Sequence, residues 1–335
     1  RFGATTAEEF KKAMKELQKQ GMKDMILDLQ GNGGGYLNAA IDLANEFLGQ
    51  KELIVYTEGR TAKRSDFYAK GNGDFRNGRL IVLVDEYTAS ASEIVSGAVQ
   101  DWDRGIIVGR RSFGKGLVQR PIDLPDGSMI RLTIARYYTP AGRCIQKPYD
   151  SSTDYNKDLI ERFNHGELMN ADSIHFPDSL KVQTKKLGRT VYGGGGIMPD
   201  YFVPIDTTLY TDYHRNLVAK GVIIKFTMKF IEGHRKELAG KYKKFESFNE
   251  KFIIDDDMMA TLREMGDKEG VKFNEEQYQK SLPLIKTQLK ALIARDLWDM
   301  NEYFRVMNTT NESVQKALEI LNSDEYQKKL KVNQH

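Results

Sequence analysis

The stretch LIVLVDEYTASASEIVSGAVQDWDRGIIVG, residues 80–109, predicts a strand, a helix and a second strand in that order. Leu80 to Val84 is an unbroken apolar run of strand length, and Ile106 to Val108 is another. Residues Ser90 to Gln100, between them, have the length and composition of a helix. Buried strands that alternate with helices are typical of a largely parallel sheet with helices packed on it.

The sequence upstream shows the same alternation. Apolar residues at helical spacing from Phe10 to Leu17 precede a short apolar run at Met25 to Leu29, which we interpret as a buried strand. The run Gly31-Asn32-Gly33-Gly34-Gly35 ends this strand, and Leu37 to Leu48 has the spacing of a second amphipathic helix. Residues Leu53 to Tyr56 predict a further strand. The first hundred residues therefore indicate an α/β fold.

The pattern becomes β-rich after residue 117. Val118 to Ile122 and Met129 to Ala135 flank the turn sequence LPDGS and predict a hairpin. Residues 148–190 are polar and irregular, so we expect a long surface excursion there. A glycine-rich loop then leads into a final short strand at Tyr201 to Ile205.

Composition changes near residue 206. Only Pro283, of eight prolines, lies beyond this point, and segments such as 217–238 and 283–307 have helical periodicity. We therefore expect two domains, an α/β core at residues 1–205 and a mostly helical C-terminal domain of unknown role at residues 206–335.

The bulk composition excludes several classes of protein. A net charge of +3 on 335 residues is small for a dedicated nucleic-acid binder. The single cysteine, Cys144, excludes an internal disulfide framework and a cysteine-rich metal site. No apolar run reaches the ~18 residues that a membrane helix needs. The chain begins Arg1-Phe2-Gly3, so we expect it to be a fragment of a longer protein, and the absence of a targeting segment leaves its location open.

Residues Gly109 to Lys115 match the start of a phosphate-binding loop, G-x-x-x-x-G-K. Such a loop needs Ser or Thr after the lysine to bind magnesium, and then the N-terminus of a helix. Gly116 follows the lysine here, and the next residues, Leu117 to Pro121, have a strand-like composition. The context therefore argues against a nucleotide site.

A second explanation for Lys115 involves a serine upstream. Ser90 lies between a strong strand and a helix, where the helix dipole favours developing negative charge, so Ser90 is a candidate nucleophile. It is equally a candidate helix cap, which is the commoner role. All five histidines lie at or beyond residue 165, outside the alternating strands and helices that carry Ser90, so a Ser-His-Asp triad has weak support. A lysine can replace histidine as the base if burial lowers its pKa, and Lys115 has apolar neighbours in the sequence. An ordinary surface lysine in a tight turn is the alternative.

Five motifs in order resemble the carboxy-terminal processing, or tail-specific, serine protease family. They are LDLQGNGGG at residues 27–35, TASASEI at 88–94, FGKGLVQ at 113–119, YTPAGR at 138–143 and GIMPD at 196–200. The resemblance covers roughly residues 3–205. It implies a crotonase-like or Clp-protease-like α/β core and a Ser/Lys mechanism without metal or organic cofactor. By position, it implies that Ser90 is the nucleophile, Lys115 its general base and Gln119 the residue that orients the lysine amine.

The resemblance also implies an oxyanion hole formed by the backbone N–H of Ala91 and one from Gly34 or Gly35. Two such donors commonly accelerate acyl transfer by orders of magnitude. Asp101 corresponds to an aspartate that is important in some relatives, although a carboxylate at a helix end is as easily structural. We expect Ser92, two residues further along the helix, to point away from Ser90.

The sequence departs from the family pattern at two positions of the glycine-rich loop and in lacking a segment that resembles the family's upstream domain. Family members usually have proline where Gly33 stands and often arginine where Gln30 stands, so the oxyanion loop is expected to be less rigid here. The PDZ domain that family members carry upstream, and that recognises the substrate's C-terminus, has no counterpart. Residues 206–335 resemble no family that we recognise.

The leading hypothesis is a serine endopeptidase that cleaves polypeptides near apolar C-termini, with homo-oligomerisation possible, membrane association open and no nucleic-acid partner. The resemblance implies an extracytoplasmic location, such as the bacterial periplasm. One alternative is a catalytically inactive binding or scaffold protein on a protease core, and the intact set Ser90, Lys115 and Gln119 argues against it. Another is a crotonase-type acyl transferase, which would have no use for the serine and lysine together.

Overall fold

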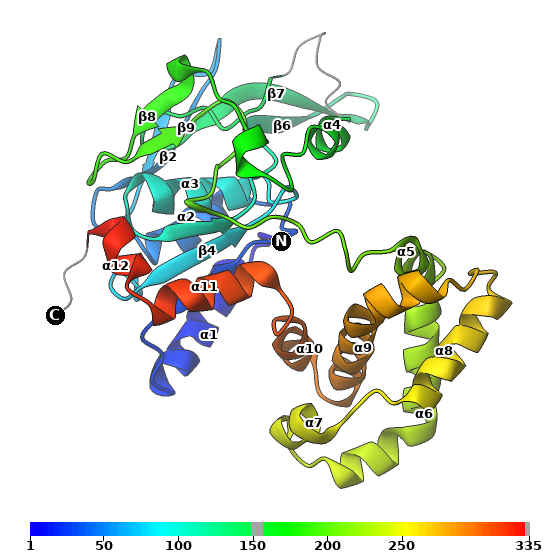
Figure 1. Ribbon diagram of the computed structural model, residues 1–335. Coiled ribbons are helices and arrows are strands. Elements are labelled where there is room, and N and C mark those ends of the chain that lie inside the picture. Colours follow the sequence, from blue (N-terminus) through cyan, green and yellow to red (C-terminus); the bar gives the residue numbers. More distant parts are fainter. Residues whose placement is uncertain (149–156, 332–335) are drawn as a thin grey trace. The chain divides into compact units, whose positions relative to one another are not determined.

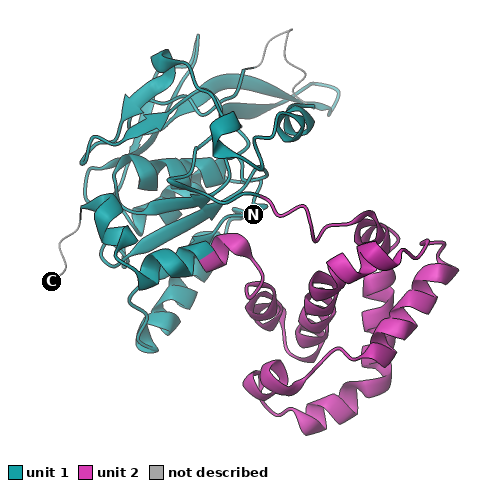
Figure 2. Ribbon diagram, viewed as in Figure 1, with its two compact units in different colours: residues 1–204, 316–335 teal, residues 205–315 magenta. Residues whose placement is uncertain are grey.

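The chain divides into two compact units, which Figure 2 distinguishes by colour. The computed structural model describes residues 1–148 and 157–331. The first unit comprises Arg1–Pro204 and the segment from Lys316 onward, and the second comprises Ile205–Gln315. The α/β character of the first and the helical character of the second agree with the fold class expected from sequence.

A four-stranded parallel sheet forms the centre of the first unit, in the order β1-β4-β5-β10. Its strands are β1 (Met25–Asp28), β4 (Leu80–Val84), β5 (Ile106–Gly109) and β10 (Tyr201–Phe202). Every residue of β4 and β5 is buried, as is usual for parallel strands that are covered on both faces. The strand, helix and strand predicted for residues 80–109 are confirmed.

A second, antiparallel sheet has the order β3-β2-β7-β6. Its strands are β2 (Leu53–Glu58), β3 (Ser65–Tyr68), β6 (Leu117–Asp123) and β7 (Met129–Tyr138), and the pair β6–β7 confirms the predicted hairpin. Helices α2 (Leu37–Asn45) and α3 (Ala91–Asp101) lie between the two sheets (Figure 1). Helix α1 (Thr6–Lys19) packs beside α2, and its Phe10 ring meets the Phe47 ring edge-on at 5.7 Å. The indole of Trp102, at the end of α3, donates a 2.7 Å hydrogen bond to the Leu53 carbonyl and so ties α3 to β2.

The expectation of an irregular surface excursion at residues 148–190 is only partly correct, and its residues 149–156 lie outside the described part. The remainder contains α4 (Asp158–Asn164), two short 3-10 turns at Ala171–Ser173 and Asp178–Leu180, β8 (Lys181–Gln183) and part of β9 (Thr190–Tyr192). Arg162, Leu168 and Thr184 are buried in the first unit. The polar composition of this segment predicted exposure, and a buried arginine such as Arg162 cannot be distinguished from an exposed one by composition alone.

The second unit is a helical assembly with its own core. Its helices are α5 (Asp212–Ala219), α6 (Val222–Lys241), α7 (Phe245–Lys251), α8 (Asp256–Lys268), α9 (Glu275–Leu297) and α10 (Met300–Met307), and α11 (Glu312–Asn322) begins in it. Aromatic side chains fill its centre, where Phe248 stacks on Phe252 at 4.7 Å and meets Trp298 edge-on at 5.3 Å. Among the helices of residues 1–148 and 157–331, none combines the length and apolar character required to cross a membrane.

The boundary expected for the helical domain is wrong at its C-terminal end. Most of α11 and all of α12 (Glu325–Leu330) belong to the first unit. Arg79 donates to the Leu321 carbonyl at 2.5 Å, and the Leu80 N–H donates to the Tyr326 hydroxyl at 2.9 Å. Helical periodicity identified an amphipathic segment here, but it carries no information on which of two cores the apolar face joins.

The Tyr326→Phe variant is expected to lower the free energy of unfolding of the first unit by about 1–3 kcal/mol, because it leaves the buried Leu80 N–H without an acceptor. The two tryptophans, Trp102 and Trp298, lie in different units, so Trp102 fluorescence in a Trp298→Phe background follows the first unit alone during urea unfolding. Tyr87→Phe, which alters an exposed tyrosine, is the control. An unchanged midpoint in Tyr326→Phe would contradict the assigned contact.

Candidate active site

Three loops meet at one edge of the parallel sheet. β1, β4 and β5 are parallel neighbours, so their carboxyl ends lie side by side, and ligands of open α/β sheets bind outside such ends. The glycine-rich loop follows β1, the loop that leads to Ser90 follows β4, and the loop that carries Lys115 follows β5. Topology therefore brings together motifs that lie far apart in the sequence.

Asp85 joins the first two of these loops. Its carboxylate accepts hydrogen bonds from the Gly31 N–H at 2.9 and 3.0 Å, and from the Tyr87 and Thr88 N–H groups at 3.0 and 2.9 Å. The Thr88 hydroxyl donates to the Leu29 carbonyl at 2.8 Å. The glycine-rich loop is thus fixed against the loop before Ser90.

Ser90 is half-buried and stands immediately before α3, with φ of 58° and ψ of −114°. Of the non-glycine residues that the structure describes, four have positive φ, and Ser90 is one of them. Such backbone strain is concentrated at functional sites, where surrounding contacts maintain it. Here the Ser90 N–H donates to Glu93 Oε2 at 2.7 Å, and the Ser90 carbonyl accepts from the Ile94 N–H at 3.1 Å.

Gly34 packs directly against the backbone that carries Ser90. Its φ is +87°, and a Cβ atom there would lie 2.8 Å from both the Ser90 Cβ and the Ala91 nitrogen. The Gly34 N–H is already used, since it donates to the Asn32 side chain at 3.0 Å. Among the described residues, the N–H groups of Ala91 and Gly35 have no such acceptor. Of the two glycines expected as alternatives, Gly35 therefore retains the available donor.

Glu93 connects the Ser90 and Lys115 loops, and sequence reasoning missed it. This fully buried carboxylate accepts the Ser90 N–H at 2.7 Å and the Lys115 N–H at 2.8 Å on Oε2. Its Oε1 accepts the Ser112 hydroxyl at 2.6 Å and the Gly114 N–H at 2.7 Å. One oxygen atom thus holds the backbones of the two expected catalytic residues within two hydrogen-bond lengths of each other. A glutamate in the first turn of a helix resembles an ordinary cap, which is why the sequence gave no stronger signal.

Burial raises the pKa of Glu93, against the opposing effect of its hydrogen bonds with Ser112, Lys115, Gly114 and Ser90. The group has four donors around it, which is the arrangement that an ionised carboxylate requires.

The side chains of Lys115 and Gln119 are exposed, so the expectation that apolar neighbours bury Lys115 is wrong. Phe113 instead turns its ring towards Lys147, whose Nζ lies 3.9 Å from the ring centroid. Gln119 lies in β6, just after a break in the register with β7. Neither side chain forms a hydrogen bond or ion pair with another described residue, and their expected roles stay predictions.

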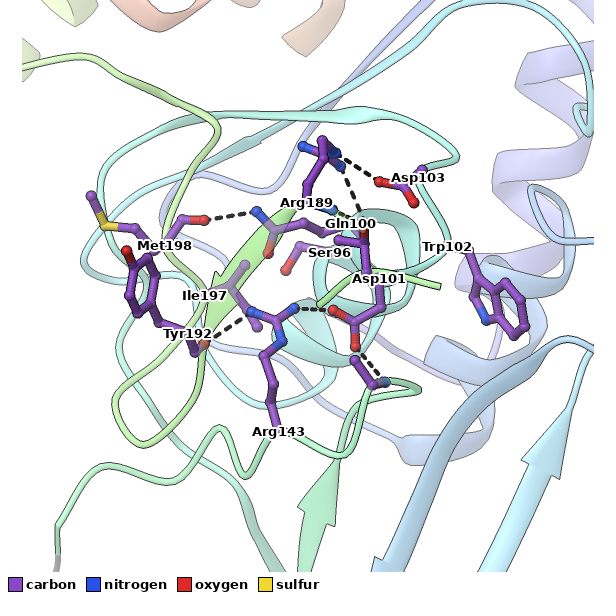
Figure 3. Close-up of polar contacts among 12 residues, drawn as sticks. Ser96, Gln100, Asp101, Trp102, Asp103, Arg143, Arg189, Tyr192, Ile197 and Met198 are labelled. Atoms are coloured by element: carbon purple, nitrogen blue, oxygen red, sulfur yellow. Dashed lines mark hydrogen bonds and ion pairs between the residues drawn. The ribbon is translucent and has the colours of Figure 1, made fainter. Parts of the chain in front are cut away.

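Asp101 lies at the opposite end of α3 from Ser90, ~15 Å away along the helix at the usual rise per residue. Its carboxylate is fully buried and contacts the Arg143 guanidinium at 2.5 Å and the Ala141 N–H at 2.8 Å (Figure 3). The Arg143 side chain also donates to the Tyr192 carbonyl at 3.0 Å. These contacts favour a structural role for Asp101, and its lower-ranked catalytic role stays a prediction.

Ser92 does not compete with Ser90 for the role of nucleophile. Its hydroxyl is buried and donates to the Asn32 carbonyl at 2.8 Å, as expected of a side chain directed away from Ser90. Asn32 is a further residue that sequence reasoning did not single out. Its side chain and carbonyl fix the glycine-rich loop to α3.

Residues 1–153 match the model of peptidase family S41. Over 146 residues the chain is 41% identical to the chloroplastic C-terminal processing peptidase of Tetradesmus obliquus, covering 44% of this chain and 31% of that protein. It is 44% identical over 146 residues to the carboxyl-terminal-processing protease of Picosynechococcus sp., covering 44% of this chain and 35% of that protein. A solved photosystem II D1 C-terminal processing protease is 41% identical, with 43% of this chain and 37% of that chain covered and a TM-score of 0.41.

The core and its three loops define an α/β protein with a candidate site at the carboxyl ends of a parallel sheet. Residues 1–153 are thus similar to peptidase family S41, and the relatives matched over this part of the chain are named as C-terminal processing proteases. The chain spans about a third of the length of these relatives. Residues 213–299 match a family of unknown function (DUF8443).

Proposed function

We propose that this chain is the catalytic part of a serine endopeptidase that cleaves polypeptides near their C-terminus. The observation that supports it best is Glu93, because a single carboxylate oxygen holds the backbones of Ser90 and Lys115. The matched relatives are named as C-terminal processing proteases, which is consistent with this reaction.

In the proposed mechanism, the Ser90 hydroxyl oxygen attacks the scissile carbonyl carbon, and the neutral Lys115 amine takes the hydroxyl proton. The carbonyl oxygen becomes an oxyanion that accepts hydrogen bonds from the N–H groups of Ala91 and Gly35. The Lys115 ammonium then protonates the departing amine as the C–N bond breaks. A water molecule, deprotonated by the same lysine, attacks the carbonyl carbon of the Ser90 ester. The lysine ammonium then returns this proton to the Ser90 oxygen as the ester C–O bond breaks, which releases the carboxylic acid and restores the serine hydroxyl and the neutral amine.

A bound polypeptide has a second role in this proposal. Lys115 is exposed, so a substrate chain lying across the site would exclude water from the amine and favour its neutral form. Gln119, four residues along on β6, would accept or donate a hydrogen bond to orient that amine. The site would thus be completed by its substrate.

The edge strand β6 is where we expect the substrate to pair. β6 ends the sheet order β3-β2-β7-β6 and begins two residues after Lys115. An extended chain can add to such an edge through main-chain hydrogen bonds, which recognise any sequence. We propose unfolded polypeptides with apolar C-termini as substrates and an extracytoplasmic location, the periplasm in a bacterium. Homo-oligomerisation is compatible with this role.

The test compares hydrolysis of a denatured protein by the wild-type chain, Ser90→Ala and Lys115→Ala. Both variants are expected to abolish hydrolysis, because each removes one partner of the proposed proton transfer. Ser96→Ala, which removes a buried hydroxyl of α3 that bonds to the Ser92 carbonyl, and Lys12→Ala, on exposed α1, are the matched controls. Undiminished hydrolysis in either active-site variant would reject the dyad.

A further inference from the structure

The loop that carries Lys115 is held from a second side by a segment that follows the family match. The match to peptidase family S41 ends at residue 153, and α4 (Asp158–Asn164) comes after it. Arg162 of α4 donates to the Arg111 carbonyl at 2.6 Å and to the Ser112 carbonyl at 3.2 Å. Both carbonyls belong to the loop between β5 and Lys115.

Arg162 is the one buried residue of α4, which reverses the usual amphipathic arrangement. Its residue surface is 3% exposed, whereas Ile160 and Phe163 of the same helix are 60% and 43% exposed. A surface helix normally turns its apolar side chains inward. In α4 the buried side chain is the Arg162 guanidinium. The helix is therefore positioned by its hydrogen bonds with the Lys115 loop and not by burial of apolar side chains.

Glu167 completes the contact by compensating the charge. It accepts from Arg162 Nε at 3.2 Å and from Arg111 Nη2 at 2.5 Å, and Arg111 Nη1 donates to the Gly195 carbonyl at 3.0 Å. Burial lowers the pKa of Arg162, so its charge is held at a cost that Glu167 and the two carbonyls offset.

A second anchor lies beside the first. The Lys147 ammonium pairs with Asp158 at 2.7 Å, at the start of α4, and the Lys147 N–H donates to the Gly114 carbonyl at 2.9 Å. The carbonyls of residues 111, 112 and 114 are thus held from this side. Glu93 holds the N–H groups of 114 and 115 from the other side.

We propose that Arg162 is a positioning residue for the Lys115 loop, supplied by a segment outside the matched family region. By holding the carbonyls of Arg111 and Ser112, it fixes the backbone from which the Lys115 side chain starts. The expected effect of Arg162 on the rate of hydrolysis rests on the proposed function. Its expected effect on the rigidity of the Lys115 loop does not. A displacement of about 1 Å at a reacting group can lower a rate by about 10²-fold.

The experiment compares Arg162→Met with Arg189→Met in the full chain. Arg189 is a similarly placed control, since it is an inward-facing arginine of the first unit that pairs with Asp103 at 2.7 Å and with Asp200, away from the Lys115 loop. Arg162→Met is expected to accelerate hydrogen–deuterium exchange of the peptide covering residues 111–117. It is also expected to lower kcat for a denatured protein by about 10²-fold with KM nearly unchanged, and to shift the pH profile of kcat.

Arg189→Met is expected to leave exchange at residues 111–117 and the pH profile as in the wild type, even where it lowers the unfolding midpoint. Arg162→Lys keeps the positive charge but has fewer hydrogen-bond donors, so its exchange rate and its kcat should lie between those of Arg162→Met and the wild type. It also provides a folded variant if Arg162→Met is unstable. Equal exchange and equal pH profiles in the Arg162 and Arg189 variants would overturn the proposal. Hydrolysis by Ser90→Ala at the wild-type rate would reject the proposed function instead, and the exchange data would still decide whether Arg162 fixes the loop.

Discussion

The Glu93→Gln variant is expected to lose about 10²-fold in kcat and about 1–3 kcal/mol in the free energy of unfolding. Glutamine has the shape of glutamate but replaces one acceptor oxygen with a donor NH₂ group. On either orientation, this NH₂ group faces two donors, the Ser90 and Lys115 N–H groups or the Ser112 hydroxyl and Gly114 N–H. The second orientation is favoured because the Ser112 hydroxyl can turn and accept. Gly114 then loses its acceptor and the loop before Lys115 shifts.

Three measurements check this prediction. Steady-state hydrolysis of a denatured protein separates kcat from KM, labelling with a serine-reactive phosphonate reports on Ser90, and Trp102 fluorescence in the Trp298→Phe background gives stability. Glu46→Gln is the matched control, because Glu46 is buried in the same unit and accepts from the Asp74 N–H and Lys11 away from the site. A Glu93→Gln variant with wild-type kcat and labelling rate would show that Glu93 does not position the site.

The pH dependence of stability has a defined sign. Burial raises the pKa of Glu93 above its ordinary value of 4.5, so between pH 4.5 and the folded pKa the folded chain holds a proton that the unfolded chain has released. Above the folded pKa, Glu93 is the ionised acceptor of its four hydrogen bonds. The stability that this group contributes is fully present below pH 4.5 and declines as the pH rises through the folded pKa. Glutamine does not titrate, so the difference in unfolding free energy between wild type and Glu93→Gln is expected to narrow as the pH rises over that window.

The sequence predicted the parts of the fold that depend on local pattern. The apolar runs of β4 and β5 and the helix between them needed no information from elsewhere in the chain. Because parallel neighbours present their carboxyl ends together, the approach of Gly34 to Ser90 follows from the same pattern. The resemblance supplied the residue roles, which the geometry of these loops accommodates.

The contacts that the sequence could not predict are long-range and polar. Glu93 resembles a helix cap until the loop at residues 112–115, about twenty positions later, is placed against it. Arg162 lies in a polar segment, where nothing distinguishes a buried arginine from a solvated one. The exposure of Lys115 was missed for the converse reason, since apolar sequence neighbours such as Phe113 can face the other side of a loop.

The Asp101→Asn variant is expected to lower the free energy of unfolding of the first unit by about 3–5 kcal/mol, because it leaves the Arg143 charge buried without its partner. Both side chains of this pair have no solvent exposure, and the asparagine NH₂ group must face either Arg143 or the Ala141 N–H. Trp102, the residue after Asp101, reports the unfolding in the Trp298→Phe background. Asp178→Asn, in an exposed pair with Lys181, is the control and should change stability little.

A catalytic role for Asp101 predicts instead a large loss of kcat with little loss of stability, so the two measurements together distinguish a catalytic from a structural role. Domains are typically stable by about 5–15 kcal/mol, so Asp101→Asn should remain largely folded at low temperature. Under those conditions we expect its KM and the pH profile of its hydrolysis to match the wild type, because ~15 Å of helix separates it from Ser90. The double variant Asp101→Asn/Arg143→Met removes both charges and should recover part of the lost stability. An unchanged unfolding midpoint combined with a large loss of kcat would support the catalytic role instead of the structural one.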